Sequence, residues 1–311
     1  MTSNHPAATL PPTMHVFERG WLSSNNILFL DDDHTATLVD TGYVSHREQT
    51  LALVQSQLSG RRLTRILNTH LHSDHCGGNV FLQQATGARL AIPPGLASAV
   101  ERWDEELLTF RATGQECPRF RHDDVLAPGT EWRLGERDWQ VLSAPGHDPH
   151  SIMLWNPADR ILISADALWQ HGFGGIFPEI EGESGFAEQA AMLELIARLA
   201  PRVVIPGHGA PFTDVDAALG RAHQRLAALS ADPARNARQV AKALIKFYLL
   251  DTRSLSLDAL IRHLSGARYF NVINERYFRV PFDQLIERSV HELVAVGAAE
   301  CHDGVVANRD G

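Results

Sequence analysis

Residues 69–79, THLHSDHCGGN, contain three histidines and one aspartate within the six positions 70–75. The first two histidines are separated by a single residue, so an extended backbone directs both side chains to the same side. The glycines at 77–78 allow close approach of the backbone, and a helix beginning there would direct its positive end at the histidines. Histidine and carboxylate side chains are typical ligands of zinc, iron and manganese. The stretch therefore predicts a metal-binding turn.

Five short apolar segments each lead into a histidine or an aspartate. These expected strands and the polar residues that follow them are 36–39 with Asp40, 65–68 with His70, 141–142 with His147, 161–164 with Asp166, and 203–205 with His208. Loops at strand ends are where a rigid scaffold places functional groups. A single histidine after a strand is usually an ordinary loop residue, but the repetition predicts one shared site.

The rest of the first two thirds of the chain predicts a mixture of strands and helices. Residues 26–30 and 36–39 flank an acidic turn, which predicts a hairpin. Residues 46–58 and 186–199 have helical spacing. Further strands are expected at 90–92 and 152–155, and the charged residues 97–124 predict a helical insertion.

The last third of the chain differs from the rest, because strands nearly stop after residue 213 and helical patterns take over. This change predicts two domains, residues 1–225 and 226–311. A helix is expected over 281–296 with Gly297 as its end, followed by a short strand pair. Helices followed by a small hairpin are typical of a winged-helix-like module, which we expect to pack against the first domain and complete its pocket.

The chain resembles the metallo-β-lactamase-fold superfamily of metallo-hydrolases over roughly residues 14–212. The matching elements, in the family's order, are Asp40 in LVDTG, the HxHxDH run from His70 to His75, His147 in APGHD, Asp166 in ISADAL and His208 in IPGHG. The resemblance implies a mixed α/β (α+β) fold, a four-layer αββα sandwich with the site on its rim. A small, mainly helical C-terminal domain follows the sandwich.

The resemblance also implies two divalent metal ions, with zinc expected and manganese or iron as alternatives. Carried over residue by residue, His70, His72 and His147 bind the first ion, Asp74, His75 and His208 bind the second, Asp166 bridges them, and Asp40 orients a ligand histidine. In such a site a hydroxide held between the ions attacks a carbonyl or phosphoryl centre. Asp74 is the expected catalytic residue, which orients the hydroxide or passes a proton.

Substrate specificity is expected from segments outside this shared core. The glycine-laced aromatic loop 167–185 is predicted to form a pocket wall, with Trp169, His171, Phe173 and Phe177 as candidate lining residues. His150 is expected to support the ligands from nearby. Cys76 is expected to be a small buried residue.

The leading functional hypothesis is a dinuclear metal hydrolase acting on a small ester, lactone, thioester or related substrate. Two alternatives are a mononuclear iron persulfide dioxygenase of the same fold and a nuclease that uses the winged-helix-like tail. The net charge of −9 makes nucleic acid an unlikely partner. Three cysteines, no signal-peptide pattern and no membrane-length apolar run predict a cytoplasmic protein without a membrane partner. The sequence does not reveal the oligomeric state.

Overall fold

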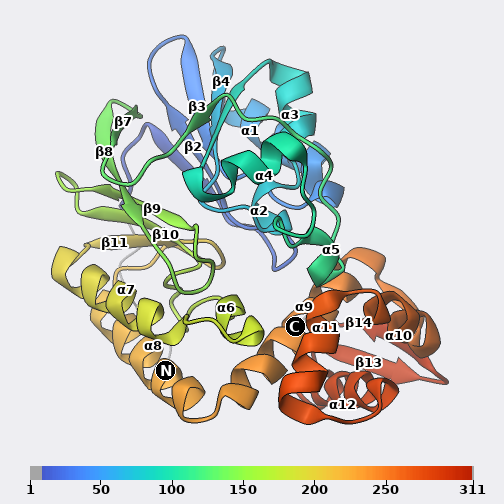
Figure 1. The fold of residues 1–311 in the computed structure, drawn as a ribbon. Coiled ribbons are helices and arrows are strands. Elements are labelled where there is room, and N and C mark those ends of the chain that lie inside the picture. The colour runs from blue at the N-terminus through green and yellow to red at the C-terminus, as the bar shows by residue number, and fades with distance from the viewer. Residues whose placement is uncertain (1–8, 310–311) are drawn as a thin grey trace.

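The computed structural model describes residues 9–309 and contains two large β-sheets with helices on their outer sides, followed by a helical C-terminal part (Figure 1). The first sheet has the order β1-β2-β3-β4-β5-β6. Its strands are β1 Met14–Phe17, β2 Asn26–Leu30, β3 Thr35–Val39, β4 Arg62–Leu67, β5 Arg89–Ile92 and β6 Asp124–Val125. The predicted hairpin is confirmed, because β2 and β3 pair antiparallel, and β3 to β6 then pair in parallel.

The second sheet has the order β11-β10-β9-β8-β7. Its strands are β7 Glu131–Leu134, β8 Arg137–Ser143, β9 Ile152–Asn156, β10 Ile161–Ala165 and β11 Val203–Pro206. Strands β7 to β10 form an antiparallel meander, whereas β10 and β11 are parallel. The parallel pair requires a crossover, which the helix α7 Phe186–Leu199 provides at the bounds that the sequence predicts.

Side chains along the strands alternate between two apolar cores, and this alternation explains the layers of the sandwich. In β2, Ile27 and Phe29 belong to the core between the sheets, whereas Leu28 belongs to the core under the outer helices. In β10, Ile161 and Ile163 face the same central core, and Leu162 packs with the helices on the opposite side. Successive side chains of a strand point to opposite faces. Both sheets are therefore covered on both faces, and the predicted αββα sandwich is confirmed.

The outer helices of the sandwich fall into two groups. The helices α1 Arg47–Gln57, α3 Asn79–Thr86 and α4 Ala97–Arg102 cover the outer face of the first sheet. The helices α7 and α8 Val215–Ala231 cover the outer face of the second sheet. The helical insertion predicted over 97–124 is mostly wrong, because only α4 and α5 Phe110–Thr113 are α-helical there. Trp103 and Thr109 have left-handed backbone conformations, which interrupt the helix.

The C-terminal part, as far as residue 309, contains four α-helices and a small sheet. The helices are α9 Pro233–Thr252, α10 Leu257–Ser265, α11 Arg268–Ile273 and α12 Phe282–Ala295, and a π-helical turn covers Asn274–Phe278. The sheet has the order β12-β14-β13, with β12 Ser254–Ser256, β13 Ala299–His302 and β14 Val305–Asn308. The predicted final helix and strand pair are confirmed, whereas the three-residue strand β12 is too short for the sequence pattern to reveal. The domain boundary at residues 225/226 stays a prediction, and residue 225 lies inside α8.

The C-terminal helices pack against the sandwich through α9 and through the loop that carries α6 Phe177–Glu181. Buried Asn236 of α9 forms two hydrogen bonds with the main chain of Ile176, at 2.8 and 3.2 Å. Ala112 and Ile180 of the sandwich belong to the same apolar cluster as the C-terminal helices. The two parts therefore share a continuous core on this side.

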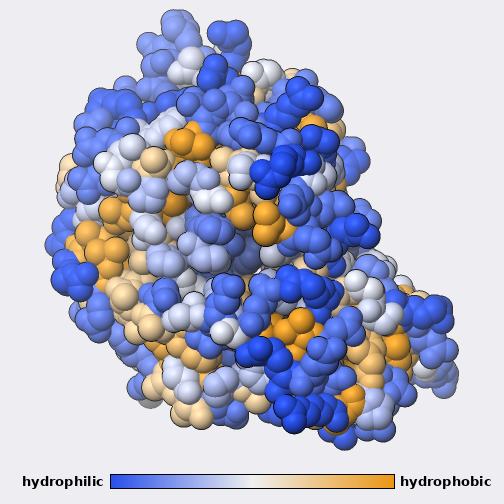
Figure 2. Space-filling view, viewed as in Figure 1, coloured by the Kyte–Doolittle hydropathy of each residue, from blue (hydrophilic) through white to orange (hydrophobic). Residues whose placement is uncertain are grey.

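The molecular surface is mostly hydrophilic on the face that Figure 2 shows, with apolar side chains scattered in small groups. Among the helices of residues 9–309, none combines the length and the apolar character needed to cross a membrane.

Candidate metal centre

The predicted polar residues do meet at one edge of the sandwich. His70 follows β4, His147 lies between β8 and β9, Asp166 follows β10 and His208 follows β11. The turn after β4 forms the short helix α2 Ser73–Cys76. Gly77 is the C-cap of this helix. A second helix, α3, begins at Asn79 with Gly78 as its N-cap, so the helix start expected at the glycine pair is confirmed.

One cluster of three ring nitrogens comes from His70, His72 and His147. The Nδ1 atom of His72 lies 3.1 Å from Nε2 of His70 and 2.8 Å from Nε2 of His147. Nδ1 of His147 lies 2.5 Å from the carbonyl oxygen of Gly175, to which it donates a proton, so its Nε2 carries the lone pair. Lone pairs converging at this spacing fit a shared cation.

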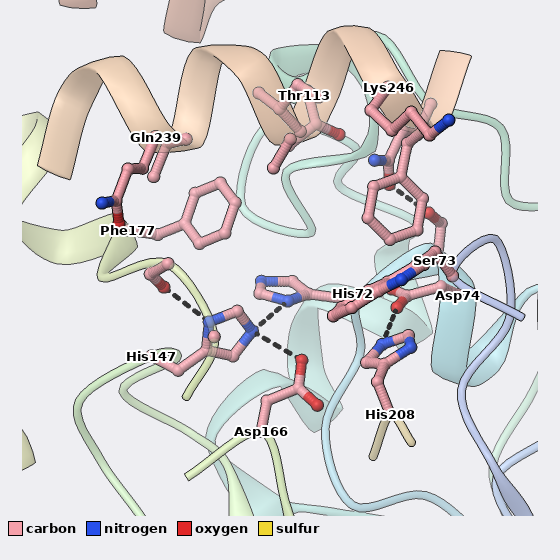
Figure 3. Close-up of a pocket in the computed structure, with 18 of the residues that line it drawn as sticks. His72, Ser73, Asp74, Thr113, His147, Asp166, Phe177, His208, Gln239 and Lys246 are labelled. Carbon is pink, nitrogen blue, oxygen red and sulfur yellow. Dashed lines mark hydrogen bonds and ion pairs between the residues drawn. The ribbon is translucent and has the colours of Figure 1, made fainter. Parts of the chain in front are cut away.

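A second cluster, next to the first, consists of Asp74, His75, Asp166 and His208. Oδ2 of Asp74 lies 3.0 Å from Nε2 of His208 and 3.6 Å from Nε2 of His75. Asp166 lies between the clusters, because its Oδ1 is 3.6 Å from Nε2 of His75 and its Oδ2 is 3.4 Å from Nε2 of His147. The bridging role that the resemblance implies for Asp166 stays a prediction, and its carboxylate lies within reach of both clusters (Figure 3).

His75 provides a test of whether a cation fits the second cluster. Its Nδ1 is 2.8 Å from Oδ2 of Asp40, whereas its buried Nε2 has no hydrogen-bond partner among residues 9–309. A buried nitrogen without a partner is costly. Here it faces two carboxylates, so a divalent ion would satisfy all three groups. The carboxylate of Asp40 also accepts hydrogen bonds from Thr69 and thus fixes the ring of His75 from behind.

The electrostatic environment favours neutral histidines in the first cluster and positive charge in the second. Burial lowers the pKa of His72 and of His147 to about 4 in each case. Burial opposes the charged form of His75 too, but the carboxylates of Asp74, Asp40 and Asp166 raise its pKa well above the usual value. Neutral imidazoles are the form that binds metals, and the field at His75 attracts a cation.

Two glycines allow the loops to approach the ligand side chains. A Cβ atom at position 207 would lie 2.1 Å from Oδ1 of Asp166, and one at 174 would lie 2.3 Å from Nδ1 of His147. Neither position has room for a side chain without moving a member of the clusters. The sequence pattern Pro-Gly-His at 206–208 thus has a steric reason.

A cavity of about 180 Å³ opens over the two clusters. Of the aromatic loop, Trp169, Phe173 and Phe177 line this cavity, and Nε1 of Trp169 donates a hydrogen bond to Oδ1 of Asp166 over 3.1 Å. The prediction for His171 is wrong, because its side chain is exposed and lies outside the cavity lining. His171 lies at the tip of the turn that joins the paired main chains of Trp169 and Gly172, where its side chain is exposed to solvent.

His150 supports the ligands only through its main-chain N–H, which donates a hydrogen bond to Oδ1 of Asp148 over 2.7 Å. Its side chain is exposed and lies against Gly95, where an added Cβ would be 2.2 Å from Nδ1 of His150. The buried carboxylate near the ligands is instead that of Asp148, whose Oδ2 lies 3.7 Å from Nε2 of His72. Cys76 is buried, as expected, with its Sγ 3.7 Å from that of Cys117.

Two groups of site residues were not evident from the sequence. Trp21 lies in the loop before β2 and stacks on His208, with ring centroids 5.3 Å apart and an interplanar angle of 16°. The helix α9 crosses over the clusters and contributes Gln239, Val240 and Phe247, among others, to the cavity wall (Figure 3). A lone tryptophan in a loop and one face of an amphipathic helix carry no signal in the sequence that relates them to the ligands.

The chain is similar to known proteins in family, sequence and structure. Residues 19–208 match the family model described as the metallo-beta-lactamase superfamily. Curated relatives include a hydroxyacylglutathione hydrolase of Methylococcus capsulatus, 34% identical over 42% of this chain and 41% of the relative. Another hydroxyacylglutathione hydrolase, from Cereibacter sphaeroides, is 31% identical over 60% of this chain and 63% of the relative. The chain thus spans between about two fifths and two thirds of these relatives.

Solved structures resemble the chain over nearly its whole length. A beta-lactamase domain protein from Burkholderia ambifaria has a TM-score of 0.58 at 20% identity and covers 99% of this chain and 98% of its own. A metallo-beta-lactamase family protein from Thermus thermophilus has a TM-score of 0.53 at 19% identity, covering 97% and 100%. These similarities show the fold, helical tail included. Since the family model also covers more than half of the chain, this protein belongs to the metallo-β-lactamase superfamily.

Proposed function

We propose that the protein is a metal-dependent hydrolase that holds two divalent ions and cleaves a small thioester. Zinc is the metal that we expect at both sites. The observation that supports the proposed hydrolase most strongly is the convergence of the two donor clusters, with Asp166 between them and the unpartnered Nε2 of His75 in the second. The names of the curated relatives favour a thioester over an ester or a lactone.

In this proposal His70, His72 and His147 hold the first ion, and Asp74, His75 and His208 hold the second, with Asp166 shared. When bound, such a pair of ions lowers the pKa of a water molecule towards neutrality and polarises a carbonyl oxygen. No serine or cysteine nucleophile is needed.

Three groups of the chain itself take part in this mechanism. Asp74 lines the cavity, and its carboxylate accepts the proton of the attacking water. Asp40 keeps His75 in the tautomer with its proton on Nδ1, so that Nε2 remains available. The α9 helix and Trp21 lie at the entrance of the cavity and limit the access of bulk water to the reacting carbonyl.

The test combines metal analysis with a substrate panel. We expect about two ions per chain and hydrolysis of thioesters at rates above those for matched esters and lactones. The variant His147→Ala should lose metal and at least ~100-fold in kcat/KM, since a first-cluster ligand is removed. A chain with one iron that consumes oxygen with a persulfide, and hydrolyses no member of the panel, would contradict the proposal.

A further inference from the structure

Aromatic rings surround the open side of the donor clusters. The ring of Phe177 lies edge-on to His72 and His147, with centroids 5.0 and 5.5 Å apart. Trp169 lies edge-on to His208 at 5.4 Å, and Trp21 stacks on the same histidine. Trp21 is nevertheless 54% exposed, which is unusual for a side chain of this size. An exposed tryptophan at the mouth of a cavity is positioned to cover an apolar ligand.

The opposite wall of the cavity is also apolar. Val240, Ala243 and Leu244 of α9 line it above the clusters. Figure 3 shows α9 crossing over the ligand side chains, with the ring of Phe177 in the space between the helix and His72. A group bound next to the clusters is therefore held between aromatic rings on one side and a mainly apolar face of α9, which also includes Phe247 and the polar Gln239, on the other.

The arginine and the lysine of the lining are both occupied. The guanidinium group of Arg225 donates hydrogen bonds to the carbonyl oxygen of Phe173 at 2.6 Å and to Oε1 of Gln239 at 3.1 Å. The ammonium group of Lys246 points away from the clusters and donates to Ala298 O, Asn308 Oδ1 and Arg309 O, at 2.6–2.9 Å. Only the aliphatic part of Lys246 is left for the cavity. Among the described residues that line the cavity, an anionic substituent held away from the donor clusters would thus be desolvated without a cationic side chain to pair with.

The size of the cavity limits what it can enclose. An apolar protein cavity of about 150 Å³ accepts one benzene molecule. The cavity here measures about 180 Å³ and therefore accommodates a single ring with a short link to the reacting carbonyl.

We propose, on the basis of the hydrolytic function proposed above, that the acyl group of the substrate is uncharged, apolar and about the size of one aromatic ring. Its carbonyl carbon faces Asp74 and Asp166, and its ring lies between Phe177, Trp169 and α9. Hydrolysis gives the aromatic carboxylic acid and the free thiol, which leaves through the mouth beside Trp21. This acyl group differs in polarity from the hydroxyacyl group in the names of the curated relatives.

The first experiment compares thioesters that share one neutral thiol, N-acetylcysteamine, and differ in the acyl group. We expect kcat/KM for the phenylacetyl thioester to exceed that for the acetyl, lactoyl and succinyl thioesters by about 10–100-fold, the effect of burying one aromatic side chain. Equal values, or a preference for lactoyl or succinyl, would overturn the assignment. The assignment would also be overturned if an aromatic thiol joined to an acetyl group raised kcat/KM while the phenylacetyl group did not.

A matched pair of variants tests the wall on α9. Ala243 lines the cavity at an exposed position, so the larger side chain of Ala243→Phe should narrow the space for the ring. The phenylacetyl-to-acetyl ratio of kcat/KM should fall by about 10-fold while the ion content stays the same. The control is Ala227→Phe, an alanine at an exposed position of α8 outside the cavity lining, which should leave the ratio unchanged. An unchanged ratio in Ala243→Phe would contradict the placement of the ring.

A binding measurement separates this proposal from the hydrolytic function itself. Phenylacetate and acetate are titrated into the metal-loaded protein, and the tryptophan fluorescence is recorded. Phenylacetate should bind about 10-fold more tightly or better, because both ligands share the carboxylate and differ by the ring. This preference in a protein that hydrolyses no panel member would overturn the proposed function alone. Equal affinities in an active hydrolase would overturn the acyl assignment alone.

Discussion

Asp40 has a left-handed backbone with a φ of 57°. Both of its carboxylate oxygens take part in hydrogen bonds. They accept hydrogen bonds from the main chain and the hydroxyl group of Thr69, and Oδ2 also faces Nδ1 of His75. Aspartate and asparagine tolerate this left-handed region better than most residues. The Asp-Thr-Gly turn therefore combines a backbone requirement with the orientation of a proposed ligand, and both favour an aspartate.

Asp40→Asn should keep the turn, because asparagine accepts the same backbone conformation and has nearly the same shape. The neutral amide is a weaker acceptor than the carboxylate for the Nδ1 proton of His75, so we expect the affinity for the metal to fall by about 10–100-fold. Metal affinity is measured by competition with a chromogenic chelator. The control Asp33→Asn changes an exposed carboxylate and should have no effect. Unchanged affinity in Asp40→Asn would show that Asp40 is only a turn residue.

Gly207→Ala should displace the carboxylate of Asp166, because the added Cβ would lie 2.1 Å from its Oδ1. We expect loss of bound metal together with a lower melting temperature. The matched control is Gly220→Ala in α8, where, apart from the surrounding helix backbone, no heavy atom of residues 9–309 lies within 4 Å of the added Cβ. That variant should be stabilised by about 0.5–1 kcal/mol, since alanine favours the helix. A fully loaded Gly207→Ala protein would mean that Asp166 has more freedom than its contacts indicate.

At the scale of elements, α9 and the segment from Asp166 to α6 position one another. Asn236 is the link, because its side chain pairs with both main-chain groups of Ile176 in a buried environment. Tyr277, near the end of the π-helical turn, adds a hydrogen bond from its hydroxyl group to the carbonyl oxygen of Glu179 over 2.6 Å. The loop that supplies Trp169 and Phe177 is thus held in place by the C-terminal helices.

Asn236→Ala leaves two buried main-chain groups without partners. We expect a loss of about 1–3 kcal/mol in the free energy of unfolding, measured by urea denaturation, and a raised KM with little change in metal content. The control Arg235→Ala removes an exposed side chain of the same helix and should change neither. If Asn236→Ala keeps the KM of the original protein, the loop is positioned by other contacts.

At the scale of the whole molecule, the C-terminal part contributes to the cavity, and its proposed role does not involve nucleic acid. Its helix α9 lines the cavity, and its apolar cluster includes residues of the sandwich. The chain as a whole carries a net charge of −9. Nucleic-acid affinity depends mainly on phosphate contacts by basic side chains.

The intact protein should therefore show no submicromolar binding to duplex DNA or RNA at physiological salt. Fluorescence anisotropy with labelled duplexes, repeated over a range of salt concentrations, measures this. A tight association that weakens steeply with salt would contradict the proposed role of the C-terminal part and favour the nuclease alternative.

The sequence by itself was sufficient for the family, the sandwich and the polar residues at the strand ends. The physical reason is that these signals are local: HxHxDH lies within six positions, and each strand is a short apolar run. Local spacing also explains the agreement for α7 and for the final helix and strand pair. The sequence was misleading for residues 97–124. Their charged composition favoured one helical insertion, but residues with a left-handed backbone interrupt the helix.

Only the tertiary structure decided which side chains form the wall of the cavity. Trp21 meets His208, and α9 meets Phe177, across long stretches of chain. The loop 167–185 contained four candidate lining residues. The folded backbone directs Trp169 and Phe173 into the cavity, whereas it directs His171 to solvent. Such directions depend on packing between distant elements. For this reason the sequence predicts the proposed ligands, whereas the shape and polarity of the space above them follow from the fold.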